Sequence, residues 1–207
     1  MNSKHFFNQV AGEWDRMRTN FYSENVREKA FEVAGVKAGQ IAADVGAGTG
    51  FITEGLLRRG LKVIAVDQSE PMLLKMKSKF AGFDEVDYLK GEAEDLPLPD
   101  GTVEYVFANM YLHHVETPPE AIGEMARILK PEGRLTVTDV DEHPFEFLRT
   151  EHHDRWLGFR RDHLKEWFTA AGLRNVLVDD LGEECRVESS NGDEVALMSI
   201  FVASGTK

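Results

Sequence analysis

The stretch Asp44-Val45-Gly46-Ala47-Gly48-Thr49-Gly50 decides the fold of this chain. It ends a short apolar run, Ile41–Val45, which has the length and composition of a buried strand. A helical pattern follows over Phe51–Arg59 and stops at Gly60. Glycines at such a junction let the backbone turn sharply and approach a ligand, and open N–H groups at a helix start favour negative charge. The stretch therefore predicts a ligand-binding loop between a strand and a helix.

Strand and helix patterns alternate from about residue 40 onward, which predicts an α/β domain with strand–helix–strand units on a parallel sheet. Seven strands are expected: Ile41–Val45, Lys62–Val66, Val86–Leu89, Val103–Ala108, Leu135–Val140, Val176–Val178 and Val195–Val202. Helices are expected at Phe51–Arg59, from near Ser69, from Pro118, and at His163–Ala171. The polar stretch Gly182–Glu194 is expected to form a loop or a hairpin.

The helix after the fourth strand has the clearest predicted start. Thr117 is placed to cap it, Pro118 suits the first helical position, and Glu120 completes a capping box. Pro131 and Gly133 are expected to end it.

Asp67 ends the second expected strand, 21 positions after Gly46. An acidic residue at about this distance can accept hydrogen bonds from both ribose hydroxyls; a helix-capping or turn aspartate is the alternative. A dinucleotide fingerprint would place a third glycine where Phe51 stands, and a large side chain there obstructs close packing of helix on strand. No Gly-Lys-Ser/Thr follows, which excludes a P-loop. The loop fits a nucleoside with an amino-acid tail better than a pyrophosphate.

Composition narrows the class of partner. The chain has 207 residues and a net charge of −12, so one domain without nucleic-acid binding is expected, because such binders use Lys and Arg to neutralise phosphates. Cys185 is the single cysteine, and no apolar run is long enough to insert into a membrane. The N-terminus lacks the apolar core of a signal peptide, so a cytoplasmic location is expected. The oligomeric state stays open.

Four segments in this order resemble the class I S-adenosylmethionine-dependent methyltransferases, and most of all the small-molecule branch with the ubiquinone and menaquinone methylases. They are Asp44–Gly50, Val66–Ser69, Gly91-Glu92-Ala93-Glu94-Asp95-Leu96-Pro97 and Leu129-Lys130-Pro131-Glu132-Gly133-Arg134-Leu135. The resemblance implies a Rossmann-like, seven-stranded, mostly parallel sheet with helices on both faces and the last strand antiparallel. It implies transfer of a methyl group from S-adenosylmethionine to O, N or C of a small molecule.

The resemblance also implies roles at the methionine and ribose parts of the cofactor. The backbone of Gly46, Ala47 and Gly48 is expected to face the methionine part. The Asn109 carbonyl is expected to contact the methionine amino group, and Asp67 to hold the ribose.

At the adenine, the resemblance places Gln68 beside the ring, Glu92 at the amino group and the Ala93 N–H at a ring nitrogen. Many relatives have Asp where Glu92 stands.

Residues 1–39 carry helical patterns before the first strand of the sheet, and residues 40–207 are expected to form the methyltransferase domain. The N-terminal segment is read either as a cap over a cleft or as plain packing on the sheet. Its stretch Phe7–Asp15 resembles a segment that helps to close the cofactor site in this branch, which makes Trp14 and Arg16 candidate contacts.

A sulfonium donor needs an aligned nucleophile and exclusion of water, and a general base helps when the acceptor begins protonated. Ligands in open α/β sheets sit beyond the carboxyl ends of the strands, which points to the histidine-bearing loops 109–116 and 139–156. His114 is the favoured base because it follows the fourth strand. The run Glu151–Asp154 has metal-ligand residue types without a recognised spacing, so no metal is predicted.

Two other functions are compatible with a glycine loop. One is a nucleotide-dependent oxidoreductase, which Phe51 and the Glu92-Ala93 segment disfavour. The other is a non-catalytic module that binds S-adenosylmethionine.

Overall fold

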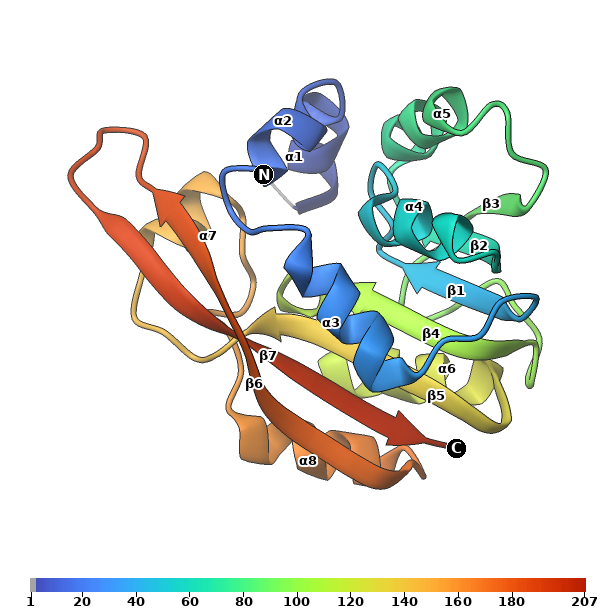
Figure 1. The fold of residues 1–207 in the computed structure, drawn as a ribbon. Helices are drawn as coiled ribbons and strands as arrows, with labels where there is room; N and C mark the ends of the chain where they lie inside the picture. The colour runs from blue at the N-terminus through green and yellow to red at the C-terminus, as the bar shows by residue number, and fades with distance from the viewer. Residues whose placement is uncertain (1–2) are drawn as a thin grey trace.

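The structure is a computed structural model that describes residues 3–207. Its seven strands form one sheet in the order β3-β2-β1-β4-β5-β7-β6 (Figure 1). Neighbouring strands from β3 to β5 are parallel, and β7 runs antiparallel to both β5 and β6, as the resemblance implies. The strands are β1 Ile41–Val45, β2 Lys62–Asp67, β3 Val86–Lys90, β4 Val103–Asn109, β5 Leu129–Val140, β6 Arg174–Glu188 and β7 Val195–Thr206.

Helices pack on both faces of the sheet and enclose two apolar cores. Side chains of β4 alternate between them: Tyr105 and Phe107 enter one core, and Val106 and Ala108 the other. This alternation is the two-residue period of a strand buried on both faces. The first core is covered by α3 Asn25–Ala34, α4 Phe51–Arg58 and α5 Glu70–Lys79, and the second by α6 Pro118–Ile128 and α8 Arg161–Ala170.

The N-terminal segment divides into two parts. The helix α3 packs on the sheet and contributes Val26, Ala30 and Phe31 to the first core. The short helices α1 Ser3–Val10 and α2 Trp14–Arg18 lie instead over the carboxyl ends of the parallel strands (Figure 1). They occupy the position from which a ligand at the strand ends would be covered.

The last hairpin is much longer than the sequence analysis expects. The strand β6 does not stop at Val178 but continues through a bulge to Glu188, so the stretch 182–194, expected as a loop or a hairpin, is the tip of a hairpin in which residues 182–188 are strand. Gly182, with φ +69°, lies within the bulge and lets the strand bend without ending. A signal was present, because Cys185 and Val187 alternate with charged residues and both are buried.

The predicted capping box of α6 is wrong. Pro118 begins the helix as expected, but Thr117 makes no capping hydrogen bond through its side chain. The Glu94 carboxylate accepts hydrogen bonds from the N–H groups of Glu116 and Thr117 at 2.9 and 3.1 Å instead. An acceptor distant in sequence therefore replaces the local cap.

The end of α6 also differs from the expectation. The helix ends at Ile128, and β5 already begins at Leu129, ahead of Pro131 and Gly133. Leu129 pairs with Val103, and the register then shifts through an irregularity before the regular ladder resumes at Arg134. Among the described residues, no helix is long and apolar enough to span a bilayer.

Candidate active site

The glycine loop between β1 and α4 is held by its own backbone and by Asp67. Gly46, Gly48 and Gly50 all have positive φ values of 69°, 53° and 91°, which favour glycine. The Val66 carbonyl accepts the N–H groups of Gly46 and Ala47 at 2.9 and 3.1 Å. These two N–H groups are therefore occupied within the protein. A loop with these donors occupied is poorly suited to grip a pyrophosphate.

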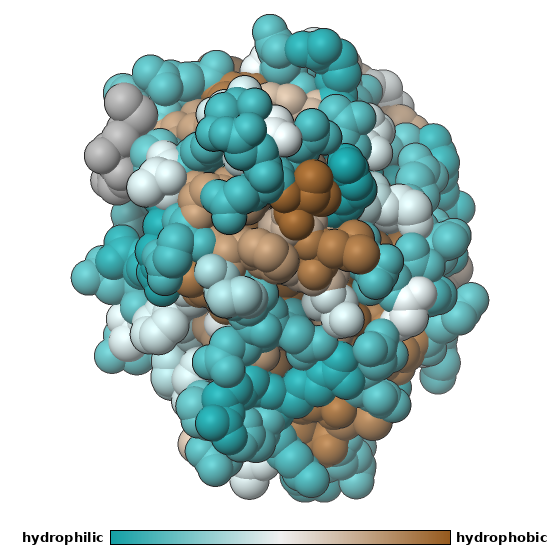
Figure 2. Space-filling model, turned by 90° about the vertical axis from the view of Figure 1, so that its left-hand side faces the viewer, coloured by the Kyte–Doolittle hydropathy of each residue, from teal (hydrophilic) through white to brown (hydrophobic). Residues whose placement is uncertain are grey.

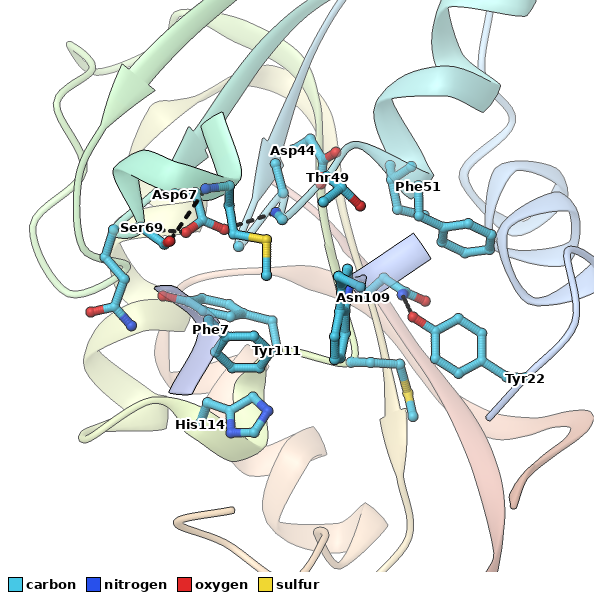
Figure 3. Close-up of a pocket in the computed structure, with 18 residues that line it drawn as sticks. Phe7, Tyr22, Asp44, Thr49, Phe51, Asp67, Ser69, Asn109, Tyr111 and His114 are labelled. Carbon is cyan, nitrogen blue, oxygen red and sulfur yellow. Dashed lines mark hydrogen bonds between the residues drawn. The ribbon is translucent and has the colours of Figure 1, made fainter. Parts of the chain in front are cut away.

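Asp67 ends β2 directly beside this loop. One carboxylate oxygen accepts the Gly48 N–H and the other accepts the Ser69 N–H, each at 2.8 Å (Figure 3). Burial raises the pKa of Asp67, although the two N–H donors act against that rise. Each carboxylate oxygen has a second lone pair, so the group can still accept hydrogen bonds from a ligand.

A second buried carboxylate lies behind the loop. Asp44 accepts hydrogen bonds from the Thr53 N–H and hydroxyl at 3.0 and 2.7 Å, which ties β1 to the first turn of α4. Burial raises the pKa of Asp44 to about 7, and the charge of nearby Asp67 adds to the rise. Asp44 therefore links the loop to the helix whether or not a ligand is bound.

These groups surround a cavity at the carboxyl ends of β1, β2 and β4 (Figure 3). Its empty volume, including the part open to solvent, is about 630 Å³, within the roughly 300–1,000 Å³ of small-molecule sites. Seven predicted site residues line it: Gly46, Ala47, Gly48, Asp67, Gln68, Asn109 and His114. We call this space the first cavity.

Two predicted adenine contacts, Glu92 and Ala93, do not line the first cavity, because Tyr111 lies between. A Cβ atom on Gly46 would fall 2.1 Å from Cγ of Tyr111, so the ring lies directly against the bare backbone. The Ala93 N–H donates to the Tyr111 hydroxyl, and burial raises the pKa of that hydroxyl. Tyr111 thus occupies the donor that the sequence analysis assigns to an adenine nitrogen.

The amide of Asn109, at the end of β4, is fixed by two neighbours. Its Nδ2 donates to the Tyr22 hydroxyl at 3.2 Å, and its Oδ1 accepts from the Thr138 hydroxyl at 2.8 Å (Figure 3). The strand β1 pairs with β4 only as far as Phe107, so the Asn109 backbone extends past the end of β1 beside the glycine loop. The sequence analysis missed Tyr22, and only its place in the N-terminal segment was a signal.

The helices α1 and α2 make hydrogen bonds to the turn after β2 and to the glycine loop. Asn8 accepts a hydrogen bond from the Ser69 hydroxyl at 2.7 Å, and Asp15 accepts one from the Thr49 hydroxyl at 2.6 Å. The candidate contact Trp14 lines the first cavity. The other candidate, Arg16, is exposed and pairs with Glu13 at 2.6 Å.

A second cavity adjoins the first and shares five of its lining residues: Phe7, Trp14, Tyr22, Met110 and His114. The other lining residues come from distant segments: Phe6, Phe21, His113, Val140, Leu148, His152, Asp154, Cys185, Val187 and Met198. Figure 2 views the side of the molecule that carries α7 Phe147–Glu151 and the β6–β7 hairpin, and apolar surface there is bordered by hydrophilic residues. An apolar guest with a few polar groups suits this lining.

Two buried histidines lie at the floor of the second cavity. His113 Nδ1 is 2.6 Å from an Asp139 carboxylate oxygen. Burial lowers the pKa of His113, but Asp139 and Asp154 outweigh burial and raise it to about 9. Burial and the neighbouring His113 lower the pKa of His114. His114 Nδ1 is buried without a hydrogen-bond partner among the described residues, and it lies where the two cavities meet.

Comparison with known proteins gives a family match over the part of the chain that forms most of the first cavity. The sequence pattern of the family described as "Methyltransferase domain" matches residues 43–137. These residues are similar to the methyltransferase domain of that family. The matched range begins inside β1 and ends within β5, so it includes the glycine loop, Asp67 and Asn109.

Two of the relatives are named as methyltransferases of quinone-type compounds. The chain is 31% identical to the demethylmenaquinone methyltransferase of Clavibacter sepedonicus over 69% of its own length and 60% of that protein. It is 32% identical to the chloroplastic 2-methyl-6-phytyl-1,4-hydroquinone methyltransferase 1 of Oryza sativa subsp. japonica, over 78% of the chain and 49% of that protein. The chain therefore spans about half to three fifths of these relatives.

A solved structure shares the fold along almost the whole chain. The S-adenosylmethionine-dependent methyltransferase of Aquifex aeolicus superposes with a TM-score of 0.69 and 23% identity, covering 96% of this chain and 97% of that one. The Rossmann-like sheet thus extends beyond the matched domain to the C-terminal hairpin.

Proposed function

We propose that this protein transfers a methyl group from S-adenosylmethionine to a small, largely apolar acceptor. One observation supports this most directly: the glycine loop and the Asp67 carboxylate meet in a cavity that opens into a second, aromatic cavity. The first suits an aminoacyl nucleoside, and the second suits an acceptor next to it. The match to the methyltransferase domain family and the quinone-type relatives support the same reading.

The residues of the first cavity fit this cofactor. Asp67 has free lone pairs for ribose hydroxyls, and Gly48 faces Trp14, whose nearest atom would lie in van der Waals contact, at 3.7 Å, with an added Cβ. Gln68 and Asn109 border the same space. For adenine to reach Glu92 and Ala93, the Tyr111 ring must swing away from Gly46. Residues 1–39 would act as a cap through α1 and α2 and exclude water.

On the acceptor side, His114 remains our candidate base. A sulfonium supplies an activated methyl group, so the protein has to orient the acceptor and take up a proton where one is released. The free Nδ1 of His114 lies where the two cavities meet, within reach of both. A net charge of −12 favours a small molecule over a nucleic acid as acceptor.

Asp67→Ala tests the proposal by calorimetry with S-adenosylmethionine. We expect affinity to fall well over tenfold, which is more than about 1.4 kcal/mol, because the loop loses its organiser and the ribose its acceptor. Asp87→Ala is the matched control, since it removes an exposed carboxylate from the neighbouring strand β3. Unchanged affinity in Asp67→Ala would contradict the ribose assignment.

The same titration separates the proposal from its alternatives. A nucleotide-dependent oxidoreductase would bind NADH, and we expect no such binding to this protein. A non-catalytic module would bind S-adenosylmethionine and leave a panel of quinols, phenols and amines unlabelled when incubated with methyl-labelled cofactor.

A further inference from the structure

Three side chains that line the second cavity converge without a hydrogen bond between any two of them, although the two histidine rings pack together with their centroids 4.0 Å apart. They are His113, His114 and Asp154, and their ligand atoms all lie within 4.8 Å of one another. We propose that these three residues bind a Zn²⁺ ion, with two imidazole nitrogens and one carboxylate oxygen as ligands. Two histidines with one carboxylate form a known ligand set of catalytic zinc, which keeps its fourth position open.

The Asp154 carboxylate gives the first reason. It lies 3.8 Å from His113 Nε2 and 3.9 Å from His114 Nδ1, and its side chain is only 8% exposed. These separations are too long for hydrogen bonds. Tetrahedral zinc with bonds of about 2.0–2.1 Å needs ligand atoms roughly 3.3 Å apart. Both separations from Asp154 would have to shorten by about half an ångström, and the two imidazole nitrogens, which lie within 4.8 Å of each other, by up to about 1.5 Å.

The orientation of the imidazoles gives the second reason. The Asp139 carboxylate lies 2.6 Å from His113 Nδ1, so Nε2 faces Asp154, and a metal ion bound there would take the place of the Nε2 proton. The His153 backbone lies beside the His114 ring, whose Nδ1 has no hydrogen-bond partner among the described residues. Oxygen acceptors that fix the ring nitrogen facing away from a metal are the usual support of histidine ligands.

His114 Nδ1 gives the third reason, because a buried nitrogen without a partner is costly. Buried polar atoms are nearly always hydrogen-bonded, and leaving one unsatisfied costs about 1–3 kcal/mol. The side chain of His114 is 6% exposed and that nitrogen is aimed at a buried carboxylate. A cation between the two would satisfy both groups at once.

The proposed ion would face the second cavity, since all three ligands line it. Its open position would accept an oxygen of the methyl acceptor, and a zinc-bound hydroxyl loses its proton near neutral pH. This step rests on the proposed function, and the ion would then replace His114 as the group that activates the acceptor. The binding of the ion itself does not depend on it.

The decisive experiment titrates Co²⁺, a spectroscopic substitute for zinc, into chelator-stripped protein. We expect one equivalent to bind with the intense visible bands of a four-coordinate ion, and Zn²⁺ to displace it. Affinity should fall at least tenfold in His113→Ala, His114→Ala and Asp154→Asn. His163→Ala is the control, because it removes an exposed histidine on α8.

Absent or weak six-coordinate Co²⁺ spectra in the wild-type protein would overturn the proposal, and so would equal loss in His163→Ala. X-ray absorption on the zinc-loaded wild type, with two imidazoles and one carboxylate expected, gives an answer that needs no variant to fold. Calorimetry with S-adenosylmethionine on the same stripped protein keeps the two proposals apart. Cofactor binding without zinc binding would contradict only the metal site.

Discussion

The two cavities differ in whether backbone groups or side chains organise them. The first is organised by a backbone loop: Gly46 and Gly48 line it, the loop is tied to the Val66 carbonyl, and the Asp67 carboxylate holds two N–H groups. The second is side chains, brought from α1, the turn after β4, α7 and its following loop, and the β6–β7 hairpin. A site formed by backbone groups restricts which residues fit each position. A site formed by side chains can be assembled from many combinations of residues. Relatives can therefore share the first cavity and differ in the second.

The largest effect is expected from adding one methyl group to the glycine loop of the first cavity. Gly46→Ala forces an L-residue to φ +69° and places its Cβ 2.1 Å from the Tyr111 ring. The strain costs about 1–2 kcal/mol, and the displaced ring or loop can no longer accept the cofactor. We expect the affinity for S-adenosylmethionine to fall about 100-fold or more by calorimetry.

Gly39→Ala separates strain from obstruction. Gly39 has φ +81°, and an added Cβ would meet nothing within 4 Å. It should lower stability by a similar amount and leave cofactor affinity unchanged. If Gly46→Ala binds the cofactor as well as Gly39→Ala does, close approach to the backbone is not what builds the first cavity.

The same contrast explains what the sequence could predict. The strand β1, the start of α4 at Phe51 and the end of β2 at Asp67 follow from glycine positions and apolar runs a few residues long. Their physical causes are local in the sequence, so these elements can be predicted from it. Of the seven predicted residues that line the first cavity, Gly46, Ala47, Gly48 and Asp67 belong to such local patterns, Gln68 and Asn109 come from the family resemblance, and His114 was predicted from its place after β4.

Contacts between distant segments could not be predicted in this way. The cap of α6 comes from Glu94, and the ring that covers Ala93 comes from Tyr111. The convergence of His113 with Asp154 depends on how two separate loops fold over the strand ends. The run Glu151–Asp154 has no recognised metal-ligand spacing, because two of the three proposed ligands, His113 and His114, lie outside it.

A pH-dependent effect tests whether burial of the carboxylate behind the loop is unfavourable for stability. The pKa of Asp44 is raised to about 7 in the folded protein, against an ordinary 3.8. Between these values the folded state binds more protons than the unfolded state. The Asp44 contribution to stability is therefore fully present below pH about 4 and is lost as pH rises through about 7.

Asp44→Asn removes this titration and keeps an oxygen acceptor for both Thr53 donors. We expect its stability relative to wild type to increase as pH rises through this window, with a slope of at most about 1.4 kcal/mol per pH unit. Urea unfolding at several pH values measures the difference. Asp87→Asn should run parallel to wild type, and parallel curves for Asp44→Asn would show that its carboxylate titrates normally.

The smallest effect concerns α1, the element that touches both cavities. Asn8 accepts the Ser69 hydroxyl at 2.7 Å, and Phe7 beside it lines both cavities. Asn8→Ala removes one hydrogen bond of about 1 kcal/mol, so cofactor affinity should fall about fivefold. Gln9→Ala, on the same helix and exposed, should leave it unchanged. If Asn8→Ala lowers only the melting temperature, α1 is packing rather than a cap, and the two cavities are closed independently of it.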